Sequence, residues 1–250
     1  GQQGFWGILG GLGEHIDAMR LHLLRAVIAV AITTALSFLF TRQLMDILAR
    51  PIPEGREVLT VISPTEAVGV YMRVALLSGL VLAMPWIVLE IYLFVAPGLM
   101  PRSRLTLLWA IPAAAILFVM GILFTYFYML PAAIPFLFNF LDFRAAWRPS
   151  EYFGLVTSLM FWVGVSFQMP MVIYALAAVG LIRARQLATQ WKVALVVITI
   201  IAAMITPTVD PVNQALVMAP MIALYGLSIV GAAVAERTRR RSLAQRAAAG

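Results

Sequence analysis

The chain has 250 residues, of which 62% are hydrophobic and only 12% are charged, and its mean hydropathy is +0.95. Soluble domains carry roughly a quarter of charged residues, so the composition excludes an ordinary soluble domain and indicates a protein with several membrane spans. The net charge of +7 does not indicate nucleic-acid binding, because the basic residues lie at the ends of apolar segments and form no recognised reader motif. The absence of Cys excludes disulfides, thiolate metal sites and cysteine nucleophiles.

The sequence predicts an all-α membrane protein with six transmembrane helices. The helices correspond to charge-free runs between consecutive charged residues, at 26–41, 74–89, 105–141, 152–182, 193–209 and 211–235. A helix needs about 20 residues to cross ~30 Å of hydrocarbon, so the first two runs must extend to about residue 23 and past Glu90. The apolar core of the fifth run, 193–205, reaches only about 20 Å. The sixth run starts at Pro211 and contains Pro220 and Gly226, so we expect the fifth and sixth helices to be short.

Local motifs mark the start of the second helix and several bends. Ser63, Pro64 and Glu66 fit the N-cap, first and third positions of a capped helix start. Prolines inside the apolar runs predict kinks, which would give a curved wall instead of a straight bundle; they are Pro85, Pro112, Pro170, Pro207, Pro211 and Pro220.

The connecting segments differ in composition. The segment 131–151 is rich in aromatic residues and is expected to form a loop at the membrane interface. The tail 236–250 is basic and polar, and we expect it to be disordered. Residues 1–235 are therefore interpreted as one transmembrane domain, with an amphipathic start at 14–22, followed by a cytoplasmic tail.

The distribution of basic residues predicts the orientation of the chain. With a cytoplasmic N-terminus and six crossings, 12 of the 18 Lys and Arg residues fall on the inner side. Short inner loops rich in Lys and Arg are what the positive-inside rule requires. The sequence therefore predicts a multi-pass protein of the plasma membrane with both termini in the cytoplasm.

Glu90 is a carboxylate within an apolar run, and such a residue is costly in a membrane unless it has a role. One interpretation is that Glu90 lies near the end of its helix and extends to water. The other is that it faces a polar groove, where it meets a cationic guest or a partner helix.

Further polar residues enter the fourth and sixth helices. Gln168 precedes Pro170 near the middle of the fourth helix, while Asn213 and Gln214 follow the short turn before the sixth. For Gln168, one interpretation is a hydrogen bond between helices and the other is a site that holds a polar element inside the membrane. We also consider that the three positions converge in one intramembrane polar groove of the folded bundle.

Catalytic signatures are absent from the sequence. It contains no HExxH, GxSxG or phosphate-binding loop, and both histidines, His15 and His22, precede the first charge-free run. Seven positions separate them, so they share a helical face, which we interpret as polar interface residues instead of a metal site. We expect neither an enzyme nor a bound metal or cofactor.

Several segments together resemble the TatC family, the multispanning subunit of the twin-arginine protein translocase. The similar segments occur in the family's order and spacing over residues 14–235; they are HIDAMRLHL at 15–23, SPTE at 63–66 with Arg73, PWIVLEIYLFVAPGL at 85–99, FTYFYMLPAAIPF at 124–136, GVSFQMP at 164–170 and TPTVDPVNQ at 206–214. The resemblance implies a six-helix, glove-shaped scaffold that binds the signal peptides of folded precursors. It also implies assembly with single-span TatA and TatB partners in the lipid bilayer. Transport would be driven by the proton-motive force. Whether the chain also assembles with further copies of itself is left open.

The resemblance also implies which residues carry these roles. The residues implied for signal-peptide binding are Arg20, Glu90, Phe94, Pro97, Ser103 and Arg104, and those implied for partner binding are Met204, Thr206, Pro207 and Asp210. Gln168 and Gln214 would contribute to the intramembrane polar groove.

The chain departs from the family pattern at four acidic positions, which are occupied by Ala18, Ser103, Gln168 and Gly226. A twin-arginine guest brings two cations, and neither Ala nor Ser replaces the charge-assisted hydrogen bonds of a carboxylate. Glu14, Asp17 and Glu90 are the acids available to compensate, although Asp17 lies one position from the family's place, about 100° around a helix. Of the three, we expect Glu90 to meet the guest. The alternative is a TatC-like paralogue that serves as a structural subunit of another membrane complex.

Overall fold

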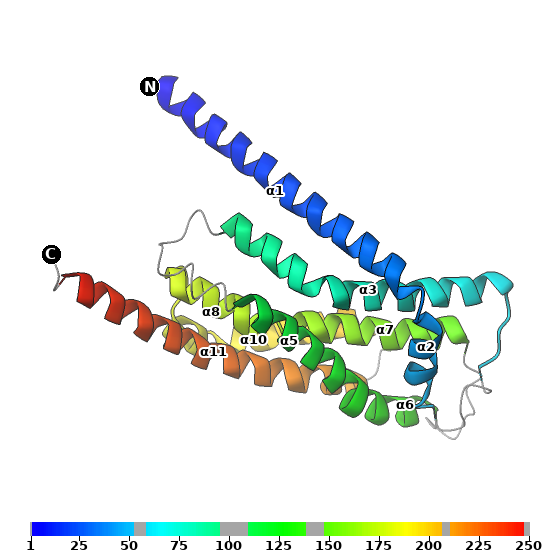
Figure 1. Ribbon diagram of the computed structural model, residues 1–250. Helices are drawn as coiled ribbons and strands as arrows, with labels where there is room; N and C mark the ends of the chain where they lie inside the picture. The colour runs from blue at the N-terminus through cyan, green and yellow to red at the C-terminus, as the bar shows by residue number, and fades with distance from the viewer. Residues whose placement is uncertain (1, 53–58, 96–109, 139–147, 207–210, 248–250) are drawn as a thin grey trace.

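The computed structural model describes residues 2–52, 59–95, 110–138, 148–206 and 211–247, and all regular structure within these ranges is helical. The helices form an elongated bundle whose longest members run roughly side by side (Figure 1). The elements in chain order are α1 (Gln2–Ser37), α2 (Thr41–Ala49), α3 (Pro64–Val95), α5 (Ala110–Phe124), η3 (Thr125–Met129), α6 (Leu130–Phe138), α7 (Pro149–Ser166), α8 (Met169–Val179), α9 (Ala184–Thr189), α10 (Trp191–Ile205) and α11 (Pro211–Ala247).

Five segments of the described chain are long and apolar enough to cross a membrane. They are Met19–Ser37, Pro64–Ile91, Ile111–Leu137, Pro149–Val179 and Pro211–Arg241. The shorter apolar helix Trp191–Ile205 has 15 residues, which corresponds to about 22 Å. Five long spans and one short one fit the six expected helices, and the short fifth helix is confirmed.

The first two spans form a pair at one edge of the bundle, where α1 packs against α3 (Figure 1). α1 ends at Ser37, four residues before the predicted end, and a turn leads into the short helix α2. α3 begins at Pro64 as the Ser63 motif predicts, and the Glu66 carboxylate accepts hydrogen bonds from the backbone N–H groups of Ile62 and Ser63.

Gly79 allows α1 and α3 to approach closely. A Cβ atom at this position would lie 2.5 Å from Cα and 2.6 Å from N of Thr34, so no larger residue fits without moving the α1 backbone. The Thr33 hydroxyl donates a 2.7 Å hydrogen bond to the Gly79 carbonyl. Small and hydroxyl residues at a contact between membrane helices allow this kind of close backbone packing.

The third span continues further than expected. The segment from Pro131 onward is helical as far as Phe138, so the prediction that a loop starts at Pro131 is wrong. A proline lacks the N–H that a helix needs and its ring clashes with the carbonyl four residues earlier. The π-helical turn η3 directly precedes α6 and widens the helix there, which accommodates Pro131 without ending the span.

The predicted proline kinks have mixed outcomes. The fourth span is interrupted at Phe167 and Gln168, immediately before Pro170, which confirms a break at that position. Pro85 and Pro220 lie inside continuous helices, and Pro211 is the first residue of α11. Pro207 lies outside the described residues.

The sixth helix is not short, and the expectation of a disordered tail is wrong. α11 has 37 residues and continues through Glu236 to Ala247. Its last part is rich in Ala, Arg, Leu and Gln, which are strong helix formers. The Glu236 carboxylate also accepts a 2.8 Å hydrogen bond from the N–H of Ala184, the first residue of α9, and this contact holds the extension against α9.

The core lies between α2, α3, η3, α6, α7, α10 and α11. Tyr152 and Phe153 of α7 are almost completely buried there, with 0% and 1% of their surfaces exposed. The Tyr152 hydroxyl donates to the Leu48 carbonyl over 2.7 Å, and the Tyr126 hydroxyl donates to the Ile47 carbonyl over 2.9 Å. These bonds satisfy carbonyls at the end of α2 and hold α2 against the bundle.

Candidate functional site

Glu90 lies in α3 with only 3% of its surface exposed. Its Oε2 accepts a 2.6 Å hydrogen bond from Nδ1 of His22 in α1, and the contact becomes an ion pair when His22 is protonated. The interpretation that Glu90 extends to water is wrong, because the carboxylate faces the neighbouring helix. The observed contact is with α1 of the same chain, and a contact with a cationic guest or a partner helix stays a prediction.

An aromatic residue completes this contact. Phe94 follows Glu90 by one helical turn and so shares its face of α3, and its ring meets the edge of the His22 ring at a centroid distance of 6.1 Å. We call His22, Glu90 and Phe94 the α1–α3 cluster. Arg20 lies one half-turn before His22 in α1 and its side chain is exposed.

The remaining residues predicted for signal-peptide binding fall outside the described part of the chain. Pro97, Ser103 and Arg104 belong to the range 96–109, which follows α3 directly. The cluster therefore lies at the end of α3 from which this segment continues.

Gln168 makes the hydrogen bond between helices that the sequence suggested. Its Nε2 donates to the carbonyl of Ala114 in α5 over 3.0 Å. This bond joins the break between α7 and α8 to the third span.

Gln214 makes an equivalent contact elsewhere. Its Nε2 donates over 3.3 Å to the carbonyl of Thr199, which joins α11 to α10. Asn213 is buried and lies with Thr206 and Leu159 around a very small cavity. Gln168 is nine residues beyond Leu159, about 13 Å along the helix axis, so the amides are held at separate contacts and the prediction of one shared groove stays a prediction.

The predicted partner surface includes an exposed apolar face of α10. Met204 is 81% exposed, and exposed apolar residues precede it at helical spacing; they are Val193, Val196, Val197 and Ile200. Thr206 is buried and its hydroxyl donates to the Ala202 carbonyl over 2.8 Å. Pro207 and Asp210 lie outside the described residues.

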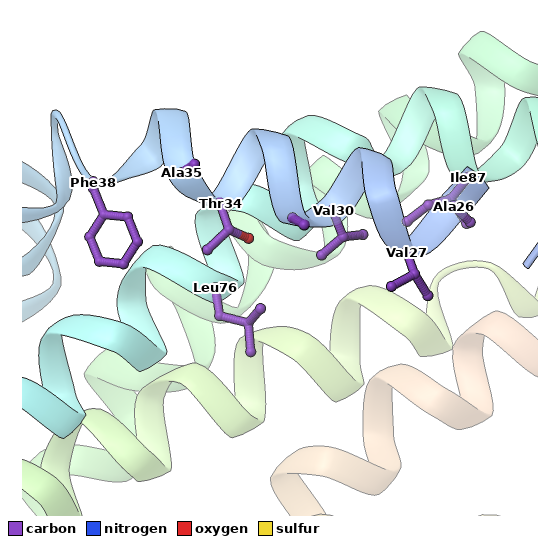
Figure 2. Close-up of a pocket in the computed structure, with 9 residues that line it drawn as sticks. Ala26, Val27, Val30, Thr34, Ala35, Phe38, Leu76 and Ile87 are labelled. Atoms are coloured by element: carbon purple, nitrogen blue, oxygen red, sulfur yellow. The ribbon is translucent and has the colours of Figure 1, made fainter. Parts of the chain in front are cut away.

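A groove of about 470 Å³ follows α1 and α3 away from this cluster. Figure 2 shows its lining, in which the side chains of Val27, Val30 and Leu76 come from α1 and α3. Thr34 contributes the only polar side chain to this lining. The groove offers contacts to lipid or another apolar surface, whereas the α1–α3 cluster offers a charge.

The sequence did not identify His22 as the partner of Glu90. The two residues are separated by 68 positions, and sequence alone gives no register between two apolar helices. One feature of the sequence could have suggested this pair. A histidine and a carboxylate are expected near the same end of two neighbouring spans, and buried ionisable residues in membranes usually pair.

The arrangement can hold a cation but contains no reactive constellation. The carboxylate of Glu90 is buried, so a guanidinium or imidazolium beside it would form short charge-assisted hydrogen bonds. The adjacent Phe94 ring adds a face on which a cation or an apolar side chain can pack.

Comparison with known proteins identifies the family. The family model described as "Sec-independent protein translocase protein (TatC)" matches residues 14–220. The TatC protein of Deinococcus radiodurans is 34% identical over 230 residues, which cover 88% of this chain and 84% of the relative, and that of Carboxydothermus hydrogenoformans is 34% identical over 220 residues, covering 87% and 90%.

A solved structure supports the same conclusion. The crystal structure described as "Twin Arginine Translocase Receptor- TatC" matches with a TM-score of 0.79 and 31% identity, covering 88% of this chain and 99% of the solved chain. Sequence and fold therefore agree over most of the chain. The chain belongs to the TatC family and is a non-enzymatic membrane subunit of the twin-arginine translocase.

Proposed function

We propose that this chain is the subunit that binds twin-arginine signal peptides of folded precursors and gathers single-span TatA- and TatB-like partners for transport driven by the proton-motive force. The plasma membrane holds the chain with both termini in the cytoplasm. The signal-peptide site comprises the α1–α3 cluster with Arg20, Pro97, Ser103 and Arg104. The partners bind at the exposed face of α10 and the turn that follows it.

The observation that carries this proposal is the buried carboxylate of Glu90, held against α1 beside an aromatic ring. Ala18 and Ser103 cannot supply a charge, and of the remaining acids Glu14, Asp17 and Glu90 we assign this role to Glu90, because its carboxylate is buried. A guanidinium forms two parallel hydrogen bonds with a carboxylate, a geometry that an imidazole cannot reproduce. An arginine of the signal peptide therefore has a stronger interaction with Glu90 than His22 has.

His22 has a defined part in this mechanism. Without a guest, it satisfies the Glu90 carboxylate, which would otherwise be buried without a partner at a cost of several kcal/mol. The guest arginine displaces the imidazole, which turns toward solvent with its 19% exposed side chain. The carboxylate thus has a hydrogen-bond partner both with and without the signal peptide.

The short helix α10 supports the partner-binding part of the proposal. A helix of about 22 Å does not cover ~30 Å of hydrocarbon, so the bilayer must thin beside it or another protein must cover the difference. The exposed stripe from Val193 to Met204 is continuous along this helix. A single-span helix that packs on this stripe would bury it and relieve the mismatch.

One observation favours a second candidate, a structural subunit of another membrane complex. Glu90 already has a partner inside the chain, and four family acids are absent. In that case the His22–Glu90 contact would only join α1 to α3, and no guest would compete for it.

Binding of a twin-arginine peptide to the purified full chain distinguishes the two functions. The Glu90→Gln variant should bind the peptide about 10- to 100-fold more weakly, because a hydrogen bond to a charged group is worth roughly 1.5–3 kcal/mol. A peptide with Lys-Lys in place of Arg-Arg should bind weakly to the parent chain, and the variant should no longer distinguish the two peptides.

The matched control is Asp46→Asn, which removes one exposed carboxylate from α2, away from the α1–α3 cluster. This variant should bind the peptide like the parent chain. Equal binding by Glu90→Gln and the parent chain would exclude Glu90 from the site and favour the structural subunit.

A further inference from the structure

Arg73 is a basic side chain within the membrane span Pro64–Ile91, and it is exposed. Among the described residues, no carboxylate lies within 4.0 Å of its guanidinium. A charge at this depth is costly unless it reaches the interface or meets an opposite charge. Arg73 therefore requires an explanation that the translocase site does not provide.

The guanidinium of Arg73 lies in a groove of about 430 Å³ between α3 and α7. Gly154 of α7 makes room for it, since a Cβ atom there would lie 2.7 Å from Nη1 of Arg73. Thr157 and Ser158 contribute hydroxyls next to this position, and the remaining lining is apolar, consisting of Leu76, Leu77, Leu80 and Phe161.

The groove has a polar end and an apolar end. Arg73 and Gly154 lie nearest to the ends at which α3 and α7 begin, whereas Leu80 and Phe161 lie deeper in the bundle. Gly154 is five residues after the start of α7, about 7–8 Å along the axis. Side chains on a helix lean toward its N-terminus, so the guanidinium extends toward the interface, where the lipid phosphates lie.

We propose that this groove binds one membrane phospholipid, with its phosphate on Arg73 and an acyl chain along Leu77, Leu80 and Phe161. Arginine binds phosphate through two parallel hydrogen bonds, and the Ser158 hydroxyl is close enough to the groove to add a third. Under the proposed orientation, the lipid belongs to the outer leaflet. This inference goes beyond the translocase function and does not depend on it.

The position of the guanidinium favours a lipid over a partner helix that carries a carboxylate. Arg73 reaches Gly154, near the end at which α7 begins, and this level is that of a lipid headgroup. A partner acid that meets Arg73 would have to lie within its own membrane span, where a carboxylate is costly.

Native mass spectrometry of the purified full chain, titrated with palmitoyl-oleoyl phosphatidylglycerol in detergent, tests this proposal. The parent chain should retain one bound lipid molecule more tightly than the other lipid molecules that associate with it. Arg73→Gln should weaken the binding of that lipid about 10- to 100-fold, whereas Arg73→Lys should have an intermediate effect because it keeps the charge but loses the two parallel bonds.

Two further variants separate local geometry from net charge. Gly154→Val keeps every charge but displaces the guanidinium, so it should weaken the same lipid by a similar factor. Arg42→Gln removes an exposed charge from α2 and should leave the retained lipid unchanged.

The result that overturns the proposal is equal lipid retention by Arg73→Gln, Gly154→Val and the parent chain. Loss of a co-purifying single-span protein in Arg73→Gln, with lipid retention unchanged, would overturn it in favour of a carboxylate on a partner helix. If Arg73→Gln does not fold, Arg73→Lys and Gly154→Val decide the question, because both keep the positive charge.

Discussion

At the scale of single residues, the sequence predicted that Glu90 has a partner but not which residue that partner is. An isolated carboxylate in an apolar run requires a partner, and this requirement predicted a contact with a cationic guest or a partner helix. The identity of His22 as that partner depends on the register between α1 and α3, which no local pattern specifies. The donation by Gln168 to Ala114 was predictable in kind for the same reason, but its acceptor was not.

Replacement of His22 tests whether the Glu90 contact stabilises the fold. His22→Ala leaves a buried carboxylate without its donor, so the free energy of unfolding should fall by about 3–5 kcal/mol. Adding Glu90→Gln to this variant should recover part of the loss, because a neutral amide costs less to bury than a carboxylate.

Thermal unfolding of the single and double variants in detergent provides the measurement. The coupling between the two positions then follows from a double-mutant cycle. Additive effects, with no recovery in the double variant, would show that the 2.6 Å contact contributes little to stability.

At the scale of elements, the charge-free runs predicted the existence of the membrane spans, but they predicted less well the residues at which the spans end. The short α10 followed directly from the length of its apolar core. For the third span and α11, the sequence predicted ends that come too early, because Pro131 and Glu236 were taken as helix ends. In the structure, η3 accommodates Pro131, and Glu236 binds the N–H of Ala184, so both helices continue.

The contact between α1 and α3 is sensitive to the size of one residue. Gly79→Ala should lower the free energy of unfolding by about 1–3 kcal/mol, because the added Cβ meets the Thr34 backbone, which cannot move as a side-chain end can. The midpoint of thermal unfolding checks this.

Gly69→Ala is the matched control on the same helix. No atom lies within 4 Å of a Cβ at this position, so this variant should unfold at an unchanged or slightly higher temperature. Equal midpoints for the two variants would contradict the close contact at Gly79.

At the scale of the whole molecule, the ordered set of motifs predicted the fold well. Single motifs are short, but their order and spacing over most of the chain matched a six-helix TatC scaffold, and the TM-score of 0.79 agrees with that fold. The site was predictable only in part. Glu90 and Phe94 lie together, whereas Gln168 and Gln214 bind different helices, because a shared polarity does not determine which faces meet.

The proposed orientation can be tested without background labelling, because the chain contains no Cys. Thr60→Cys precedes α3 and should react with a membrane-impermeant maleimide in intact spheroplasts. Thr189→Cys, at the end of α9, should react only after the membrane is permeabilised. The opposite pattern would reverse the orientation, and labelling of both in intact cells would contradict the six-span arrangement.

The most direct test of the central claim is export of a twin-arginine reporter in cells that lack their own TatC. These cells should receive this chain together with its cognate single-span partners. We expect the folded reporter to cross the membrane with the parent chain and to remain in the cytoplasm with Glu90→Gln. A reporter that stays in the cytoplasm, although the parent chain is stable in the membrane and co-purifies with an unrelated complex, would contradict the proposed function.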